Sequence, residues 1–219
     1  GNYVGVCATD PAYADFCNDK LIGAYEFADT AGPEDVNGHG SHTASTSGGN
    51  YVEVEFEDGV GGTITLNISG VAPHANLIAY KVLNDEGSGW TSDLAAGADQ
   101  AVADMVNVIN YSIGPNSGTA EPWIDLVELA FLDATAAGIF VSVSAGNSGP
   151  APNTLGHSSP WTAVMGGTTH NRVLAHPLDI VTDENSMLGL AAVEGNGPPL
   201  MADLSAPIIF GGDVDAENI

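Results

Sequence analysis

Short apolar runs alternate with longer Ala-rich stretches through the middle of the chain. Four of the apolar runs are rich in β-branched and aromatic residues and predict buried strands: residues 76–83, 106–112, 139–146 and 161–167. Between them, residues 91–104 and 121–138 have the apolar spacing of helices. Strands and helices that alternate over short connections predict an α/β fold, with a doubly wound, mainly parallel sheet and helices on both of its faces.

Each of the two predicted helices carries boundary signals. Thr91 or Ser92 is expected to cap the first helix. The residues expected along the apolar face of this helix are Leu94, Ala98, Ala101 and Met105. In the second helix, Pro122 is expected in the first turn and Gly138 is expected to end the helix.

Two regions depart from this alternation. Residues 51–70 (YVEVEFEDGVGGTITLNISG) alternate apolar and polar positions around a Gly-rich turn, which predicts a β-hairpin. After about Arg172 the alternation fades into a mixed segment that contains GNGPP at residues 195–199. Residues 207–214 (PIIFGGDV) then have the pattern of a strand that begins a new structural region.

The chain is strongly acidic. Its 28 Asp and Glu residues are accompanied by only three basic residues, Lys20, Lys81 and Arg172, so the net charge is -25 at pH 7. Nucleic acids and anionic membranes bind cationic surfaces, so neither is expected as a partner. No apolar run reaches the roughly 18 residues of a membrane-spanning helix. The composition fits a hydrated acidic surface that keeps the protein in solution.

The chain has two cysteines, Cys7 and Cys17, in a turn-rich segment. A loop of this length can be closed by a disulfide when the two side chains face each other. The alternative is a pair of free, buried thiols. We favour the disulfide, which indicates an oxidising, extracytoplasmic setting.

Unusual loops follow the predicted strands. NYSIGPNSG follows the second strand, and SAGNSGP at residues 144–150 follows the third. In open α/β sheets, functional groups gather beyond the C-terminal ends of the strands. Small residues there allow another backbone to come close, and the amide of Asn147 can point into the open space. A further stretch, NGHGSHTAST at residues 37–46, places His39 between two glycines at the start of a helical pattern.

Six segments in this order resemble the subtilisin-like serine proteases, the subtilases: CNDKLIGAYEF, NGHGSHTASTSGGN, GVAPHANLIAYKV, VNVINYSIG, SAGNSGP and PWTAVMGGTTHNR. The resemblance is to large secreted members with an inserted protease-associated domain. It implies a partial, subtilisin-like catalytic domain over residues 1–172, with the hairpin as an insertion. Residues 173–219 are then a connecting segment that leads toward the protease-associated insert.

By this resemblance, His39 is the catalytic general base. A histidine at a helix N-terminus meets the positive end of the helix dipole, which favours the neutral imidazole that a base must be. His39 could instead bind a metal with His42, although no third ligand is evident nearby, or it could be purely structural. Asn147 matches the oxyanion-hole residue, whose amide donates to the tetrahedral intermediate. Its alternative role is that of a turn former before Gly149.

The resemblance also implies two walls of a substrate site. One wall pairs with an extended substrate backbone, and the other borders the pocket for the side chain before the scissile bond. Ordinary strand ends are the alternative for both walls. The residues of the first wall are Ser112, Ile113 and Gly114, and those of the second are Ser144, Ala145 and Gly146.

The other two members of the Asp/His/Ser triad have no match. No Asp-Ser/Thr-Gly turn precedes CNDKLIGA, and no Gly-Thr-Ser-Met-Ala sequence occurs further on. We therefore expect an internal piece of a secreted serine endopeptidase that acts on protein or peptide substrates. The isolated chain should be inactive, because the triad acts as a unit. Apolar surface exposed by the missing parts would favour self-association.

Two rival functions remain open. The first is a non-catalytic, peptide-binding or regulatory module on a subtilase scaffold. The second, a calcium-stabilised structural domain, rests only on acidic loops such as residues 83–89, which lack the ligand spacing of a known calcium loop. The protease function requires no cofactor, and calcium is open only as a structural ion.

Overall fold

The computed structural model describes residues 2–57, 63–115, 118–169, 176–181 and 186–192. The chain divides into two compact units. The first consists of residues 1–52 and 67–169, and the second consists of residues 53–66 and 170–219. Two features expected from the sequence, GNGPP and the strand at residues 207–214, lie outside the described residues.

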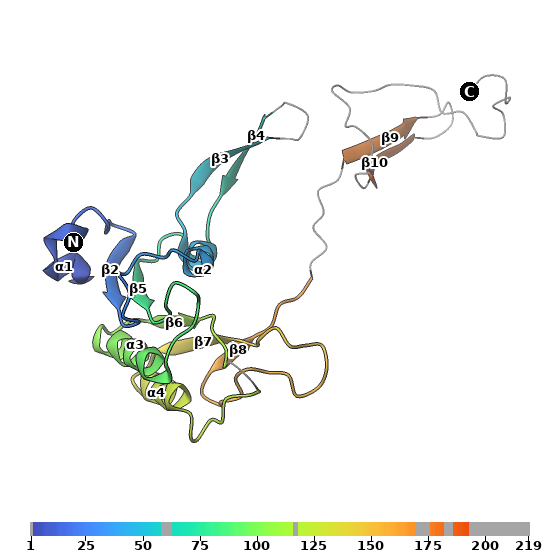
Figure 1. Cartoon of the computed structure of the whole chain (residues 1–219). Helices are drawn as coiled ribbons and strands as arrows, with labels where there is room; N and C mark the ends of the chain where they lie inside the picture. The colour runs from blue at the N-terminus through green and yellow to red at the C-terminus, as the bar shows by residue number, and fades with distance from the viewer. Residues whose placement is uncertain (1, 58–62, 116–117, 170–175, 182–185, 193–219) are drawn as a thin grey trace. The chain divides into compact units, whose positions relative to one another are not determined.

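The first unit contains two parallel sheets of three strands each (Figure 1). One sheet has the order β1-β2-β5, and its strands are β1 (Val4–Gly5), β2 (Leu21–Glu26) and β5 (Leu77–Lys81). The other has the order β6-β7-β8, and its strands are β6 (Val108–Tyr111), β7 (Phe140–Ser144) and β8 (Ala163–Met165). All four strands expected in the middle of the chain form, and their parallel pairing confirms the α/β class.

Helices lie on both faces of β5, as the sequence predicts. Side chains alternate between the two faces of a strand, so Leu77 and Tyr80 of β5 lie on opposite sides. Gly48, at the end of α2 (His39–Gly48), approaches Leu77 so closely that an added Cβ would lie 3.0 Å from its side chain. Gly97, within α3 (Thr91–Ala103), approaches Tyr80, whose Cβ would lie 3.8 Å from an added Cβ. A glycine at each contact lets the helix backbone pack against the strand.

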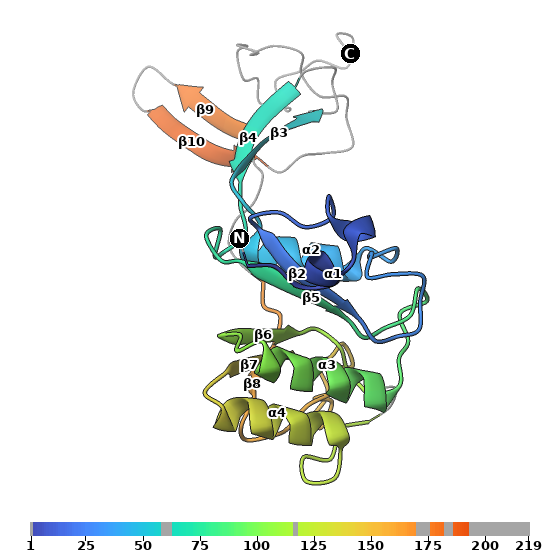
Figure 2. The same cartoon turned by 90° about the vertical axis from the view of Figure 1, so that its left-hand side faces the viewer.

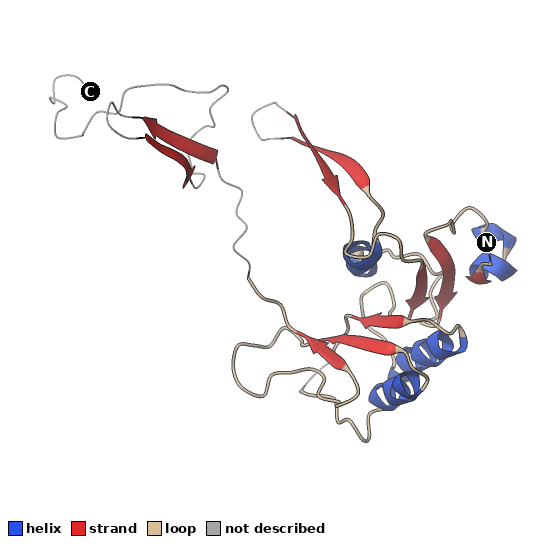
Figure 3. Ribbon diagram, turned by 180° about the vertical axis from the view of Figure 1, so that it is seen from behind, coloured by secondary structure: helices blue, strands red, loops and turns tan. Residues whose placement is uncertain are grey.

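The main core lies between α4 (Leu126–Ala136) and the β6-β7-β8 sheet. Its largest side chain, Phe131, is 0% exposed and packs edge-on against Tyr111, with ring centroids 4.9 Å apart. The helices α3 and α4 lie side by side along the sheet (Figures 2 and 3). The other buried members of this core are Ala98, Val127, Ala130, Ala134, Ile139, Val141 and Val143.

Two expectations about α3 are wrong. Trp90, rather than Thr91 or Ser92, is the N-cap residue of α3, and it makes no side-chain cap. Met105 does not extend the apolar face, because α3 ends at Ala103 and Met105 has φ 55 and is 83% exposed.

The second helix starts later than expected. Asp125 caps α4, and its side chain accepts hydrogen bonds from the backbone N–H groups of Val127 and Glu128. This carboxylate satisfies the free donors of the first turn, so the helix begins there and Pro122 lies in a preceding turn. The expected end is confirmed, since Gly138 has φ 89, a conformation that glycine adopts without strain.

The predicted hairpin forms from β3 (Val52–Glu57) and β4 (Thr63–Ile68), which pair as a two-stranded sheet. Beyond residue 170, two strands that the sequence pattern did not reveal, β9 (His176–Val181) and β10 (Ser186–Ala192), pair antiparallel. Their short apolar runs follow no clear alternation. The expected domain division at residue 172 stays a prediction.

Near the N-terminus, a short helix α1 (Val6–Thr9) and a 3₁₀ turn η1 (Pro11–Tyr13) follow β1. Cys7 lies within α1 and Cys17 follows η1, and their Cα atoms are 5.9 Å apart, within the range of a disulfide. The structure therefore brings together the two cysteines that the sequence pairs.

Replacing Phe131 should test the position of the core. Phe131→Ala should lower the free energy of unfolding by about 3–5 kcal/mol, because it leaves a cavity between α4 and the sheet. Leu126, on the same helix but 58% exposed, provides the control, and Leu126→Ala should cost less than about 1 kcal/mol. Denaturant unfolding measures both, and equal losses would contradict this assignment of the core.

Candidate functional site

The two expected walls of the substrate site lie at the C-terminal ends of neighbouring strands. Ser112 directly follows β6, and Ser144 is the last residue of β7. Ser144 Oγ donates to the carbonyl oxygen of Ile113 at 3.4 Å, a long hydrogen bond that joins the two walls. Asn110 Nδ2 donates to Ser112 Oγ at 3.1 Å. Parallel pairing of β6 and β7 thus brings these segments to the same edge.

Asn147 lies in the loop that leaves β7. The preceding Gly146 has φ 87, and an added Cβ there would lie 3.4 Å from the backbone nitrogen of Gly156. Ala145 is held by backbone bonds on both sides: its N–H donates to Met165 at 2.9 Å, and its carbonyl accepts from Gly156 at 3.0 Å. This strand end is therefore fixed, whereas the Asn147 side chain is exposed.

His39 is the first residue of α2 and is exposed. Gly38 precedes it as the N-cap residue, with φ 91, which suits glycine. Among the described residues, the His39 side chain makes no hydrogen bond, to either wall or elsewhere. Its role as a general base therefore remains a prediction, as does the oxyanion role of Asn147.

A carboxylate that the sequence analysis missed holds the turn around His39. Asp35 Oδ1 accepts from the backbone N–H groups of Asn37 and Gly38 at 3.1 and 2.8 Å, and Oδ2 accepts from Ser41 at 2.7 Å. Although partial burial opposes ionisation, these bonds lower the pKa of Asp35 to about 2. The charge also lies at the positive end of the helix dipole. Asp35 therefore fixes the start of the helix that carries His39.

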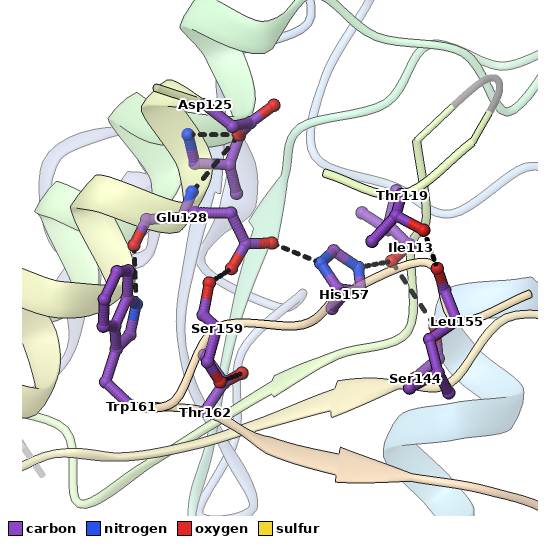
Figure 4. Close-up of polar contacts among 11 residues, drawn as sticks. Ile113, Thr119, Asp125, Glu128, Ser144, Leu155, His157, Ser159, Trp161 and Thr162 are labelled. Carbon is purple, nitrogen blue, oxygen red and sulfur yellow. Dashed lines mark hydrogen bonds and ion pairs between the residues drawn. The ribbon is translucent and has the colours of Figure 1, made fainter. Parts of the chain in front are cut away.

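A buried polar network lies behind the two walls (Figure 4). His157 Nδ1 lies 2.5 Å from Glu128 Oε1, and Ser159 Oγ donates to the other oxygen of the same carboxylate. His157 Nε2 lies 2.7 Å from the carbonyl oxygen of Ile113. Trp161 Nε1 donates to the backbone carbonyl of Glu128 at 2.8 Å. The side chains of Glu128, His157 and Ser159 are almost completely buried.

The pKa values of the pair move in opposite directions. Burial alone would raise the pKa of Glu128, but the hydrogen bonds from His157 and Ser159 hold it below its usual value. Burial alone would lower the pKa of His157, but the bonds to Glu128 and to the Ile113 carbonyl raise it. Both shifts favour the charged forms. The carboxylate and the imidazolium are therefore stabilised as a buried ion pair.

One signal in the sequence could have revealed this network. Glu128 lies among apolar residues of α4 that recur at helical spacing, and a carboxylate on such a face needs a buried partner. The sequence does not identify that partner, because His157 is 29 residues further on and in a loop.

Metal sites and membrane spans receive no support from the described residues. Within them, no group of three or more His, Cys, Asp or Glu side chains is placed to hold a metal ion. Of the helices in the described ranges, none is long and apolar enough to cross a membrane.

Parallel sheets flanked by helices define an α/β scaffold, and loops follow the C-terminal ends of its strands. The sequence model of the Subtilase family matches residues 7–192. The chain belongs to this family of serine proteases, which confirms the resemblance drawn from its six segments.

Relatives and a solved structure give the extent of the similarity. Subtilisin-like protease SBT2.1 of Arabidopsis thaliana is 39% identical over 195 residues, which is 81% of this chain and 23% of the relative. Subtilisin-like protease SBT1.4 of the same plant is 35% identical over 227 residues, with coverage of 95% and 28%. Sphericase is structurally similar with a TM-score of 0.46 and 29% identity, over 74% of this chain and 49% of that one. The chain spans about a quarter of the length of these plant relatives.

The anchoring role of Asp35 can be tested through pH. Asp35→Ala should destabilise the chain by about 1 kcal/mol at neutral pH, as expected for loss of a capping carboxylate. Because the pKa of Asp35 is lowered in the folded state, its contribution is complete above the usual carboxylate range and is lost as pH falls toward about 2. The difference in melting temperature between wild type and variant should therefore shrink below about pH 4.

Asp99→Ala is the matched control, since Asp99 is exposed and makes no hydrogen bond through its side chain to the described residues. A difference between wild type and Asp35→Ala that stays constant from pH 7 to pH 2 would contradict the anchoring role.

Proposed function

We propose that the full-length protein is a secreted serine endopeptidase that hydrolyses peptide bonds through an Asp/His/Ser triad. In this proposal His39 is the general base, which takes the proton of the serine nucleophile. Asn147 donates its side-chain amide to the oxyanion of the tetrahedral intermediate. The Asp and Ser belong to parts of the protein outside this chain, so the isolated chain would be inactive.

The observation that carries the proposal is the joined pair of strand ends at β6 and β7. A protease that binds an extended peptide needs a fixed backbone edge with free groups for strand addition. Ser112, Ile113 and Gly114 would provide this edge, and Ser144, Ala145 and Gly146 would form the facing wall. The bond between Ser144 and Ile113 supports the proposal because it holds the two walls together.

The proposed setting is extracellular. Support comes from the disulfide-range pair Cys7 and Cys17, since disulfides persist in oxidising compartments. The protease chemistry would need no cofactor, and any calcium would be structural. The net charge of -25 supports a protein or peptide substrate rather than nucleic acid or an anionic membrane. The segment after residue 172 would lead into a protease-associated insert.

We further expect the isolated chain to self-associate. Val108 and Phe140 are paired across β6 and β7, and with Met165 on β8 they lie on the sheet face opposite the core. Each is more than 50% exposed, which leaves an apolar face on this sheet. Size-exclusion chromatography with light scattering should show oligomers, and Phe140→Glu should shift them toward monomer. A wild-type chain that elutes only as a monomer would exclude this behaviour.

Reaction with a fluorophosphonate probe tests the main proposal. The full-length protein should be labelled at its serine nucleophile, and the isolated chain should not be labelled. His39→Ala in the full-length protein should reduce the labelling rate by at least about 10³, because the serine then lacks its base. His74→Ala, which removes another exposed histidine, should leave labelling unchanged.

A full-length protein that is folded but unlabelled would refute the protease function. It would favour a non-catalytic, peptide-binding module on the same scaffold. If the His39→Ala variant is still labelled, only the role of His39 is contradicted, and the protease function stands.

A further inference from the structure

The buried pair of Glu128 and His157 has no role in the proposed triad chemistry. Burying two charged groups costs free energy that their attraction only partly offsets, so the pair is a poor source of stability by itself. Its side chains are nevertheless 0% and 3% exposed and have no unsatisfied polar atom within the described residues. The contacts of His157 indicate what the pair does.

The loop that carries His157 contacts both walls of the proposed substrate site (Figure 4). The N–H of Gly156 donates to the carbonyl of Ala145 at 3.0 Å. His157 Nε2 lies 2.7 Å from the carbonyl oxygen of Ile113, which also accepts the longer bond from Ser144. The Ile113 carbonyl is therefore the point at which the two walls and this loop meet.

The partners of the imidazole define its protonation state. A carbonyl oxygen can only accept, so Nε2 must carry a proton to bond Ile113. On the other side of the ring, Nδ1 faces a carboxylate oxygen of Glu128 at 2.5 Å. The second oxygen of this carboxylate already accepts from Ser159. Only the imidazolium form of His157 donates to an ionised carboxylate and to a carbonyl at the same time.

Other groups that face His157 come from two neighbouring elements. Asp125, the cap of α4, adds negative charge that favours the imidazolium. The Tyr111 ring on β6 lies edge-on, with centroids 5.6 Å apart. Burial raises the pKa of Tyr111, so this phenol stays neutral where His157 titrates. His157 and Asp125 also line a cavity of about 160 Å³ beside Ile113 and Gly114.

We propose that His157, held by Glu128, is a positioning residue for the substrate-pairing segment Ser112–Gly114, and that it releases this segment when it loses its proton. A neutral imidazole donates at one nitrogen only. Deprotonation therefore either breaks the bond to Ile113 or leaves the Glu128 carboxylate buried without its charged partner. Either change loosens the backbone edge against which a peptide would pair. This inference rests on the proposed function, because it takes the segment to bind substrate.

The first test needs no variant. The full-length protein is assayed across pH with an extended peptide amide, which spans the segment, and with a short ester, which does not reach it. Because burial is outweighed by the two hydrogen bonds, the pKa of His157 is raised, and its proton is lost on the alkaline side of the ordinary histidine range. The KM for the peptide should rise about tenfold over that range, as expected for loss of a charged hydrogen bond, while its kcat stays constant. Neither constant for the ester should change there.

Variants then assign the effect to His157. Gln at this position keeps an amide donor but does not titrate, so His157→Gln should give a peptide KM that is independent of pH over this range. Glu128→Gln should move the rise in KM to lower pH, because it removes the charge that favours the imidazolium. His74→Gln, which changes an exposed histidine elsewhere, should match wild type.

The outcomes separate this inference from the protease function. If the ester is hydrolysed but the peptide KM does not change with pH, or changes alike in wild type and His157→Gln, the inference is wrong and the protease function stands. If His157→Gln lowers thermal stability without altering the pH profile of the KM, the residue is only structural, and the inference is again wrong. If neither substrate is hydrolysed and the probe does not label, the proposed function fails and this inference fails with it.

Discussion

The ion pair between Glu128 and His157 joins the helix layer to the strand ends, and the arrangement of the proposed site depends on it. Glu128 belongs to α4, the helix that covers the core, whereas His157 bonds the carbonyl that links both walls. A pair at this position couples the position of α4 to that of the Ile113 backbone. Because both groups are buried, loss of either partner would leave an uncompensated charge in the interior.

The parallel pairing of the strands also determines how the two walls of the proposed site are arranged. Parallel pairing brings the ends of β6 and β7 to one edge, and short backbone bonds from β8 and Gly156 then fix the loop before Asn147. The core beneath this edge is dense, with Phe131 and Val141 almost completely buried. A rigid base of this kind would suit the proposed site, which would have to hold an extended peptide without reorganisation.

In so acidic a chain, a few lysine and backbone hydrogen bonds stabilise the loops. The two basic side chains within the described residues both bind the chain's own backbone carbonyls. Lys20 donates to Pro73 and Ala75, and Lys81 donates to Glu34 and also pairs with Asp85. At the start of α2, backbone N–H groups instead of basic side chains stabilise the Asp35 carboxylate. At this position, backbone donors at a helix N-terminus thus take the place of a basic side chain.

The sequence alone determined the α/β class, the strands from β5 to β8, the hairpin and the family, because apolar periodicity and local motifs encode them directly. It also placed His39 at the start of a helix. Only the tertiary structure showed that Asp125 delays the start of α4, that Met105 leaves the core, and that Asp35 holds the His39 turn. It alone paired Glu128 with His157, since contacts between residues 29 positions apart depend on how helix and loop pack in space.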